Sequence, residues 1–235
     1  YNLDELLGQN SQNKPNITFA AAHSLSLSVM PELIKNINQS NKNFIYSVEA
    51  IDVDQTVKTL IEGKSDFIFS FYDENLSQEP FLAKKILESK LFPVSATDKD
   101  KQPLYHFSQE TIPLLNYTKQ SYMGRLVNRK LNIYSHLNFK TCFISSMSEL
   151  LKNMVLNKQG IAWLPEYSIK NEIKQNKLVI LDNDELTIPI KAYITRADGK
   201  MIFLNNIKGN RTYLKTTYQK GNWGRVMFNK MMTLT

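Results

Sequence analysis

Apolar and polar positions follow a regular rhythm through the first 72 residues of the chain. Short apolar or β-branched runs, typical of buried strands, are each followed by a segment with apolar residues at helical spacing. Ser24, a frequent N-cap residue, stands at the start of the first helix, and Gly63 stands at the end of the second. Pro31 lies inside the first helix and is expected to distort it. The predicted order is strand, helix, strand, helix, strand, at residues 17–23, 24–39, 44–52, 53–63 and 66–72.

A longer extended stretch at 82–96 interrupts this rhythm, and a second alternating series follows it. The second series is predicted as strands and helices at 112–117, 121–132, 139–145, 146–160, 160–165 and 167–177, with an extended return at 178–195. Two such series joined by long extended segments indicate an α/β fold with two lobes, two crossovers and a cleft between the lobes. After Arg196 the pattern has no clear period.

The rhythm also predicts where the two lobes begin and end. The first lobe is expected to comprise residues 14–94 plus 191–235, and the second residues 95–190. The crossovers are expected near Pro93 and Pro189, where the two long extended segments would pass from one lobe to the other.

Composition and charge narrow the class of protein only slightly. The 235 residues are 42% hydrophobic and 22% charged, which is typical of a globular protein. No apolar run approaches the ~20 residues that span a bilayer, and the first residues do not resemble a secretory signal, so a cytoplasmic protein without membrane contact is expected. Cys142 is the only cysteine, which excludes an internal disulfide. The net charge of +7 comes from scattered Lys and Arg residues and does not by itself indicate a nucleic-acid partner.

Candidate catalytic residues are few. The three histidines, His23, His106 and His136, do not have the spacing of metal ligands, and the common nucleophile, metalloprotease and phosphate-binding motifs are absent. Ser24 follows His23 directly, but neighbours in sequence seldom point at each other. We therefore expect no enzyme, no catalytic residues, no metal site and no cofactor.

Two predicted strand-to-helix junctions carry a methionine two residues after a serine. Met123 follows Ser121, and Met147 follows Ser145. Backbone N–H groups at a helix start lack partners, and oxidation would turn the methionine thioether into a sulfoxide, a strong hydrogen-bond acceptor. The pattern is therefore compatible with two oxidant sensors. Methionine also commonly fills irregular gaps in a core, and the residues alone leave that interpretation open.

Three motifs resemble the effector-binding domain of LysR-type transcriptional regulators. They are "ITFAAAHSLSLSVMPELIKNI", "VDQTVKTLIEGKSDFIFS" and "KNMVLNKQGIAWLPEYSIKNEIKQNKLV", and the likeness covers residues 16–195. The resemblance implies a two-lobed, periplasmic-binding-protein-like (type 2) fold with an interlobe cleft. It also implies that residues 1–13 end a linker helix, and that the N-terminal winged helix-turn-helix of the family is absent from this chain.

Within the family, the chain resembles the hypochlorite-responsive regulators of enteric bacteria, in which methionine oxidation is the activating event. The resemblance implies Met123 and Met147 as redox sensors. A further methionine of that mechanism would fall near Ile37, and this chain has none there. Residues at the strand ends and helix starts that should face the cleft are candidates for effector binding: His23, Ser24, Phe71, Ser121, Tyr122, Ser145, Ser146 and Pro165.

The resemblance also implies partners for the chain. These are a second copy in an antiparallel dimer built on helices 25–39 and 146–158, a possible tetramer at full length, and DNA bound through the absent domain. Hypochlorite, or a small anion, would occupy the cleft.

An alternative interpretation keeps the fold but changes the ligand. Ser24, Ser145 and Ser146 at helix starts would then hold a small anion or metabolite, as in a metabolite-responsive regulator or a solute receptor.

One expectation concerns exposure rather than function. Met123, at the start of a helix facing the cleft, is expected to be more accessible than Met154, which lies in the middle of a helix on an apolar stripe.

Overall fold

The computed structural model describes residues 16–40, 44–181, 184–197, 201–203 and 213–215. The first series of elements is β1 (Asn16–Ala22), α2 (His23–Ser28), α3 (Met30–Ser40), β2 (Ile45–Ile51), α4 (Val53–Ile61), β3 (Phe67–Phe71) and the short η2 (Glu74–Leu76). The long strand β4 (Phe81–Ala96) then leads into the second series. Within the described residues, no helix is both long and apolar enough to cross a membrane.

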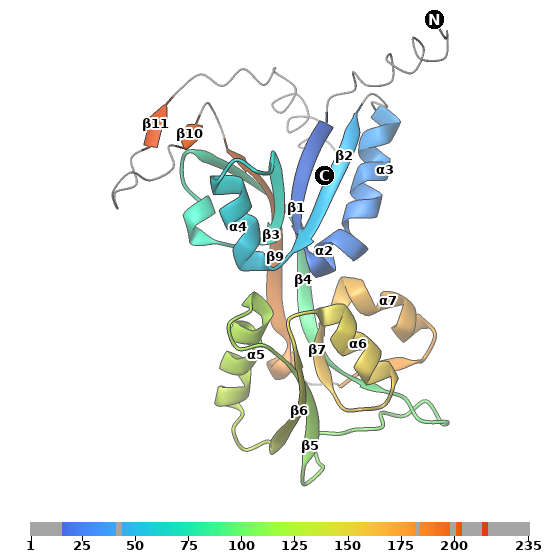
Figure 1. Ribbon diagram of the computed structural model, residues 1–235. Coiled ribbons are helices and arrows are strands. Elements are labelled where there is room, and N and C mark those ends of the chain that lie inside the picture. The colour runs from blue at the N-terminus through green and yellow to red at the C-terminus, as the bar shows by residue number, and fades with distance from the viewer. Residues whose placement is uncertain (1–15, 41–43, 182–183, 198–200, 204–212, 216–235) are drawn as a thin grey trace, which may run out of the picture.

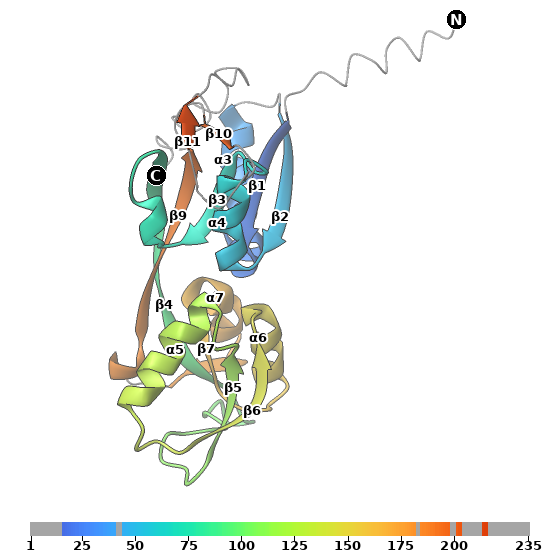
Figure 2. The ribbon, with the colours of Figure 1, turned by 60° about the vertical axis from the view of Figure 1, so that its left-hand side comes forward.

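The second series forms the other lobe, as Figures 1 and 2 show. Its elements are β5 (Ile112–Tyr117), α5 (Tyr122–Ile133), β6 (Phe139–Ser145), α6 (Ser148–Leu156), β7 (Ala162–Pro165), α7 (Glu166–Lys174), β8 (Leu178–Ile180) and η3 (Asp184–Leu186). The chain returns to the first lobe through β9 (Ile188–Ala197), and two short strands, β10 (Met201–Phe203) and β11 (Tyr213–Lys215), pair with each other beyond it.

One mixed sheet runs through both lobes because two of its strands are shared. Its order is β2-β1-β3-β9-β4-β7, and β8 also pairs with β4. β1 is parallel to β2 and β3, whereas β9 is antiparallel to β3 and β4. The parallel pair β5–β6 forms a separate small sheet, and a bridge between Leu114 and Ile161 connects it to the chain just before β7.

The shared strands β4 and β9 make one antiparallel ladder that passes from lobe to lobe (Figure 1). The ladder extends from the Phe81–Ala197 pair to the Leu91–Ile188 pair, with an irregularity between Lys85 and Leu87. Pro189, near which a crossover was expected, lies opposite Lys90 inside this ladder. Pro93, near which the other was expected, lies opposite Trp163 of β7.

Aromatic side chains fill the interior of each lobe. In the first, Phe19 stacks on Phe67 with ring centroids 5.4 Å apart. In the second, Phe139 meets Trp163 edge to face at 5.7 Å, and the buried Trp163 Nε1–H donates to the Leu186 carbonyl at 2.8 Å. That hydrogen bond holds the turn η3 against β7, so the return at 178–195 is two strands separated by a turn, and the prediction of one extended segment there is wrong.

The first helical segment is broken near Pro31, as its sequence predicted. α2 ends at Ser28 and α3 begins at Met30, because proline is tolerated in the first turn of a helix but not in its interior. The prediction that Ser24 caps this segment is wrong. α2 already begins at His23, its N-cap position is Ala22, and the Ser24 hydroxyl bonds to Tyr167 instead.

Gly160 sets how closely the small sheet approaches β7, and it generates a prediction. Its φ is +154°, and a Cβ there would lie 2.6 Å from the Pro113 carbonyl oxygen, while the next N–H, of Ile161, donates to that same oxygen at 2.9 Å. We expect Gly160→Ala to lower the free energy of unfolding by ~1–3 kcal/mol, measured by urea denaturation. Gln159→Ala, at the exposed neighbouring position, should change it by less than ~0.5 kcal/mol, and equal effects of the two would contradict this account.

Candidate functional site

A cleft of about 160 Å³ lies between the lobes, where five strands end. Four of these strands are followed in the chain by α2, α4, α5 and α6, and residues at or near the starts of these helices line the cleft from both lobes. The lining residues are Ala22, His23, Ser24, Ile51, Asp52, Val53, Asp54, Phe71, Tyr117, Thr118, Gln120, Ser121, Tyr122, Met123, Ser146 and Ser148. A space of this size suits a small inorganic or organic ligand rather than a drug-sized one.

Most of the residues predicted for the site line this cleft: His23, Ser24, Phe71, Ser121, Tyr122, Met123 and Ser146. Three others do not. The Ser145 hydroxyl accepts the Met147 N–H at 3.0 Å, and Met147 itself is 37% exposed at the start of α6. Pro165 is buried at the end of β7, opposite Leu91 of β4.

Sequence reasoning missed several polar residues of the lining: Asp52, Asp54, Tyr117, Thr118, Gln120 and Ser148. All of them lie at strand-to-helix junctions, and Asp52 and Asp54 flank the start of α4. The ends of neighbouring parallel strands meet at one edge of a sheet, so the position of Asp52 directly after a strand could have identified it as a cleft residue. Tyr117 was missed because it is the last residue of an apolar strand, where a core side chain is the ordinary expectation.

The expectation that Met123 is more accessible than Met154 is wrong. Met123 is only 6% exposed, whereas Met154 is partly buried. The reason is that the face of α5 carrying Met123 also carries Val127, one turn further on, and both pack into the core. Met123 therefore lines the cleft as part of its wall. Ile37, where a further methionine was sought, is a core residue that is 1% exposed.

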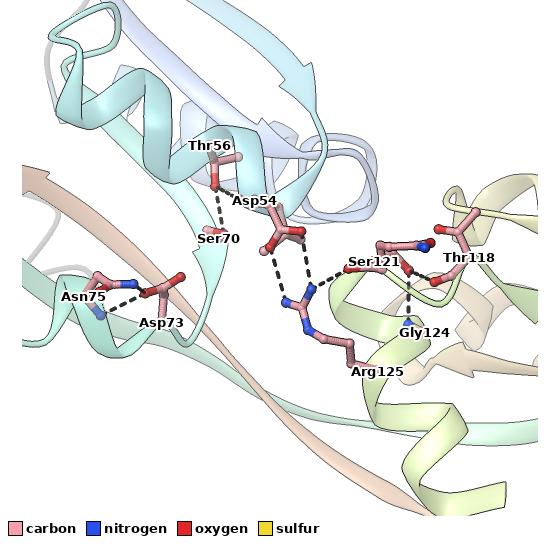
Figure 3. Close-up of polar contacts among 11 residues, drawn as sticks. Asp54, Thr56, Ser70, Asp73, Asn75, Thr118, Ser121, Gly124 and Arg125 are labelled. Carbon is pink, nitrogen blue, oxygen red and sulfur yellow. Dashed lines mark hydrogen bonds and ion pairs between the residues drawn. The ribbon is translucent and has the colours of Figure 1, made fainter. Parts of the chain in front are cut away.

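The start of α5 is held in place by a tight local arrangement (Figure 3). The Ser121 hydroxyl donates to the Thr118 carbonyl at 2.8 Å and accepts the Gly124 N–H at 3.1 Å. A Cβ at Gly124 would lie 1.9 Å from the Thr118 carbonyl oxygen, so only glycine allows this approach. The arrangement fixes the first turn of α5, which carries Tyr122 and Met123.

Three side-chain contacts join the lobes across the cleft, and each pairs residues far apart in sequence. Ser24 and Tyr167 share a hydrogen bond of 2.8 Å, and the Phe71 and Tyr122 rings stack with centroids 4.8 Å apart and planes 7° apart. An Arg125 guanidinium nitrogen lies 3.2 Å from an Asp54 carboxylate oxygen (Figure 3). Hydrogen bonds and ring stacks of this kind contribute roughly 0.5–1.5 kcal/mol, and exposed ion pairs less than about 1 kcal/mol.

The charged side chains of the lining are Asp52 and Asp54, and each lies near a basic or imidazole side chain. Asp54 faces Arg125, whose guanidinium also donates to the Gln120 carbonyl, and His23 Nε2 lies 4.0 Å from an Asp52 oxygen. Among the described residues, no group of three or more His, Cys, Asp or Glu side chains comes together in a way that could hold a metal ion.

Two hydroxyl groups in the lining, those of Tyr117 and Ser148, are buried with no hydrogen-bond partner other than each other. Tyr117 is 1% exposed and Ser148 is 4% exposed. Leaving a buried hydroxyl unsatisfied costs about 1–3 kcal/mol. Burial raises the pKa of Tyr117 well above its usual value, the neighbouring Tyr167 and Glu149 add to this, and the hydrogen bond with the Ser148 hydroxyl opposes it. Tyr117 is therefore a neutral O–H donor at physiological pH.

The fold and this cleft define the class of protein. The chain belongs to the LysR family, because residues 10–201 match the model of the LysR substrate binding domain. Family members are transcriptional regulators and not enzymes, and the fold is the type 2 periplasmic-binding-protein-like fold expected from the sequence.

Particular relatives narrow the comparison. The chain is 51% identical over 200 residues to the HTH-type transcriptional regulator YjiE of Escherichia coli K12, covering 85% of this chain but only 65% of that protein. It is 50% identical to the HTH domain-truncated transcriptional regulator QseD of Escherichia coli O157:H7, over 85% of this chain and 81% of QseD. The regulatory domain of HypT from Salmonella typhimurium has a TM-score of 0.79 and 45% identity, over 94% of this chain and 95% of that domain.

The buried tyrosines predict how stability changes in alkali. Burial raises the pKa of Tyr117, Tyr122 and Tyr167 above the usual value of 10.0. Below pH 10 these hydroxyls are neutral in both folded and unfolded chains, whereas above it the unfolded chain releases protons that the folded chain keeps. We expect the free energy of unfolding to fall as pH rises above about 10, and to fall less steeply in Tyr117→Phe. Denaturant unfolding at a series of pH values measures both slopes, and identical slopes would contradict the assignment.

Proposed function

We propose that the chain is the sensor domain of a transcription regulator that detects hypochlorite through oxidation of Met123. The observation that carries this proposal is the position of Met123 in the wall of the interlobe cleft. It lies directly after Tyr122, whose ring stacks on Phe71 of the other lobe. A change in the chemistry of Met123 would therefore act beside a contact between the lobes.

The physical effect of oxidation follows from the burial of this side chain. Met123 sits among apolar groups, and its sulfoxide would be a polar group that requires a hydrogen-bond donor. To reach a donor, the first turn of α5 has to shift, and this turn also carries Tyr122 and Arg125, which contact Phe71 and Asp54 across the cleft. Oxidation would thus bias the position of one lobe against the other, a change that an attached DNA-binding domain could read.

Relatives support the choice of signal. Full-length HypT from Salmonella typhimurium, described as a hypochlorite-specific LysR-type regulator, is 52% identical over 85% of this chain, with a TM-score of 0.75. A HypT regulatory domain with methionine replaced by glutamine has also been solved, at 45% identity and a TM-score of 0.78. The proposal extends to the whole protein: a cytoplasmic regulator whose N-terminal helix-turn-helix binds DNA. DarR of Vibrio fischeri, 33% identical to this chain, has been solved in complex with DNA.

Met147 is proposed as a second, subsidiary sensor. Its side chain is 37% exposed, so an oxidant in solution can reach it without entering the cleft. It occupies the N-cap position of α6, where no side chain caps the helix, so a sulfoxide oxygen there would lie near free backbone N–H donors.

The exposed apolar residues support the proposed antiparallel dimer. On the first lobe, Leu27, Ile45 and Val48 lie in α2 and β2 beside α3. On the second lobe, Ile144, Met147 and Leu150 lie at β6 and α6. Tyr72 and Ile133 are also exposed but lie outside these two patches. In a two-fold symmetric dimer, the first-lobe patch of each copy would pack against the second-lobe patch of the other copy, so both contacts occur twice. Met147, the proposed second sensor, would then lie at the interface.

A second candidate function is the binding of a small anion in the same cleft. The start of α6 supports it, because this helix lacks a side-chain cap and Ser146 and Ser148 line the cleft beside it. A bromide-bound form of the HypT regulatory domain, 45% identical to this chain, is also known. Calorimetric titration with chloride or bromide tests for anion binding. If the domain is an anion sensor, binding alone should change the arrangement of the lobes, whereas a methionine-oxidation sensor requires the sulfoxide.

The first prediction of this proposal concerns Met123 itself. In the intact regulator, Met123→Leu should lose most of the transcriptional response to hypochlorite, because leucine has no oxidisable sulfur. Leucine keeps volume and apolar character, so the free energy of unfolding should fall by less than ~1.5 kcal/mol. Met123→Gln, which has a polar carbonyl in place of the sulfoxide, should activate a reporter gene without oxidant. Met154→Leu is the matched control and should respond like the unmodified regulator; a normal response in Met123→Leu would disprove the proposal.

The second prediction uses the size of the cleft. In the single chain Met123 is 6% exposed and Met147 is 37% exposed, so at concentrations low enough to separate the proposed dimer a bulky chloramine should oxidise Met147 well before Met123. Hypochlorite is small enough to enter a space of about 160 Å³ and should oxidise both. Peptide mass spectrometry after graded doses of each reagent measures the two ratios. Equal protection of Met123 against both reagents would mean that the cleft does not admit hypochlorite.

A further inference from the structure

The Tyr117 and Ser148 hydroxyls, which have no hydrogen-bond partner outside their own pair, belong to separate elements of the second lobe. Tyr117 is the last residue of β5, and Ser148 is the first residue of α6. Both are more than nine-tenths buried, and both line the same cleft as Met123. When two hydroxyls have only each other as partners, one O–H proton is used in their hydrogen bond and the other is left without an acceptor, so the pair can donate to a new acceptor that forms in the cleft.

Met123 in its reduced form is not that acceptor. A thioether sulfur accepts hydrogen bonds only weakly, whereas a sulfoxide oxygen is a strong acceptor. The loop between Tyr117 and Met123 is held by Ser121, which bonds to the Thr118 carbonyl and the Gly124 N–H. That loop keeps Tyr117 and Met123 at the same cleft wall.

We propose that the Tyr117 and Ser148 hydroxyls form the receptor for the sulfoxide oxygen of oxidised Met123. This inference rests on the proposed function, in which hypochlorous acid oxidises Met123. The oxygen of the acid becomes bonded to the sulfur, the sulfur gives up two electrons, the chlorine leaves as chloride, and the proton passes to solvent. The two O–H groups then donate to the new S=O oxygen. Because its pKa is raised by burial, Tyr117 keeps its proton and remains a donor.

The location of the receptor predicts the direction of the change. Both donors lie in the same lobe as Met123, on β5 and α6, so the sulfoxide is anchored within the second lobe. The first turn of α5 would move with it, and the contacts that Tyr122 and Arg125 make with the other lobe would have to adjust. The receptor therefore determines where the oxidised side chain goes, while the speed of oxidation depends on access to the sulfur.

The test measures unfolding of this chain in urea before and after oxidation with hypochlorite, with the fraction of Met123 sulfoxide measured by peptide mass spectrometry. In Tyr117→Phe and in Ser148→Ala, Met123 should be oxidised to the same extent as in the unmodified chain. Oxidation should then raise the unfolding equilibrium constant about tenfold more than it does in the unmodified chain, because the sulfoxide lacks a donor. The extra effect should vanish when Met123→Leu is added to either variant.

Matched controls separate this role from a general effect of removing a hydroxyl. The hydroxyls of Tyr46 and Ser89 are buried without partners but lie outside the cleft lining. Tyr46→Phe and Ser89→Ala should leave the effect of oxidation unchanged, and Ser148→Thr, which keeps a hydroxyl, should behave like the unmodified chain.

Two results would overturn the inference, and they are distinguishable. If Met123 is oxidised and both Tyr117→Phe and Ser148→Ala respond to oxidation like the unmodified chain, the receptor is wrong while the sensor remains. If hypochlorite leaves Met123 unoxidised in the unmodified chain, the proposed function fails and the receptor fails with it.

Discussion

The antiparallel ladder between β4 and β9 is the constraint on which the arrangement of the molecule depends. It is the hydrogen-bonded connection that runs from one lobe into the other, and its ends pair with β3 in the first lobe and β7 in the second. The side-chain contacts across the cleft are each modest, whereas the ladder is a run of paired backbone groups. The ladder therefore keeps the lobes connected, while the side-chain contacts at the cleft determine how their helix starts face each other. A chemical change at the cleft can alter those contacts while the ladder stays in place.

Local patterns in the sequence predicted the alternation of strands and helices, because periodicity and Gly or Pro positions are local properties. The break near Pro31 is such a case, whereas the capping role assigned to Ser24 failed because α2 starts one residue earlier than periodicity indicated. The turn at η3 was missed because it depends on the Trp163 hydrogen bond to Leu186, 23 residues away.

The cleft was predictable only in outline. Residues at strand ends gather there for a topological reason, and seven of those expected in the site do line it. The contact between Asp54 and Arg125 joins residues 71 apart, which no local pattern reveals. The burial of Met123 and the isolation of the Tyr117 and Ser148 hydroxyls from any partner but each other are likewise tertiary properties, since each depends on how α5 and α6 pack against β5.

The position of β9 between β3 and β4 has a consequence for how the chain folds. β9 begins at Ile188, so the sheet of the first lobe cannot be completed until the entire second lobe has left the ribosome. The second lobe is a continuous insertion and has its own strands and helices available by then. The strands that enter and leave it are also neighbours, since Leu91 of β4 pairs with Ile188 of β9, so its folding brings the two halves of the first lobe together. Folding of the inserted lobe thus replaces the slow search that closing a loop of this length would otherwise require.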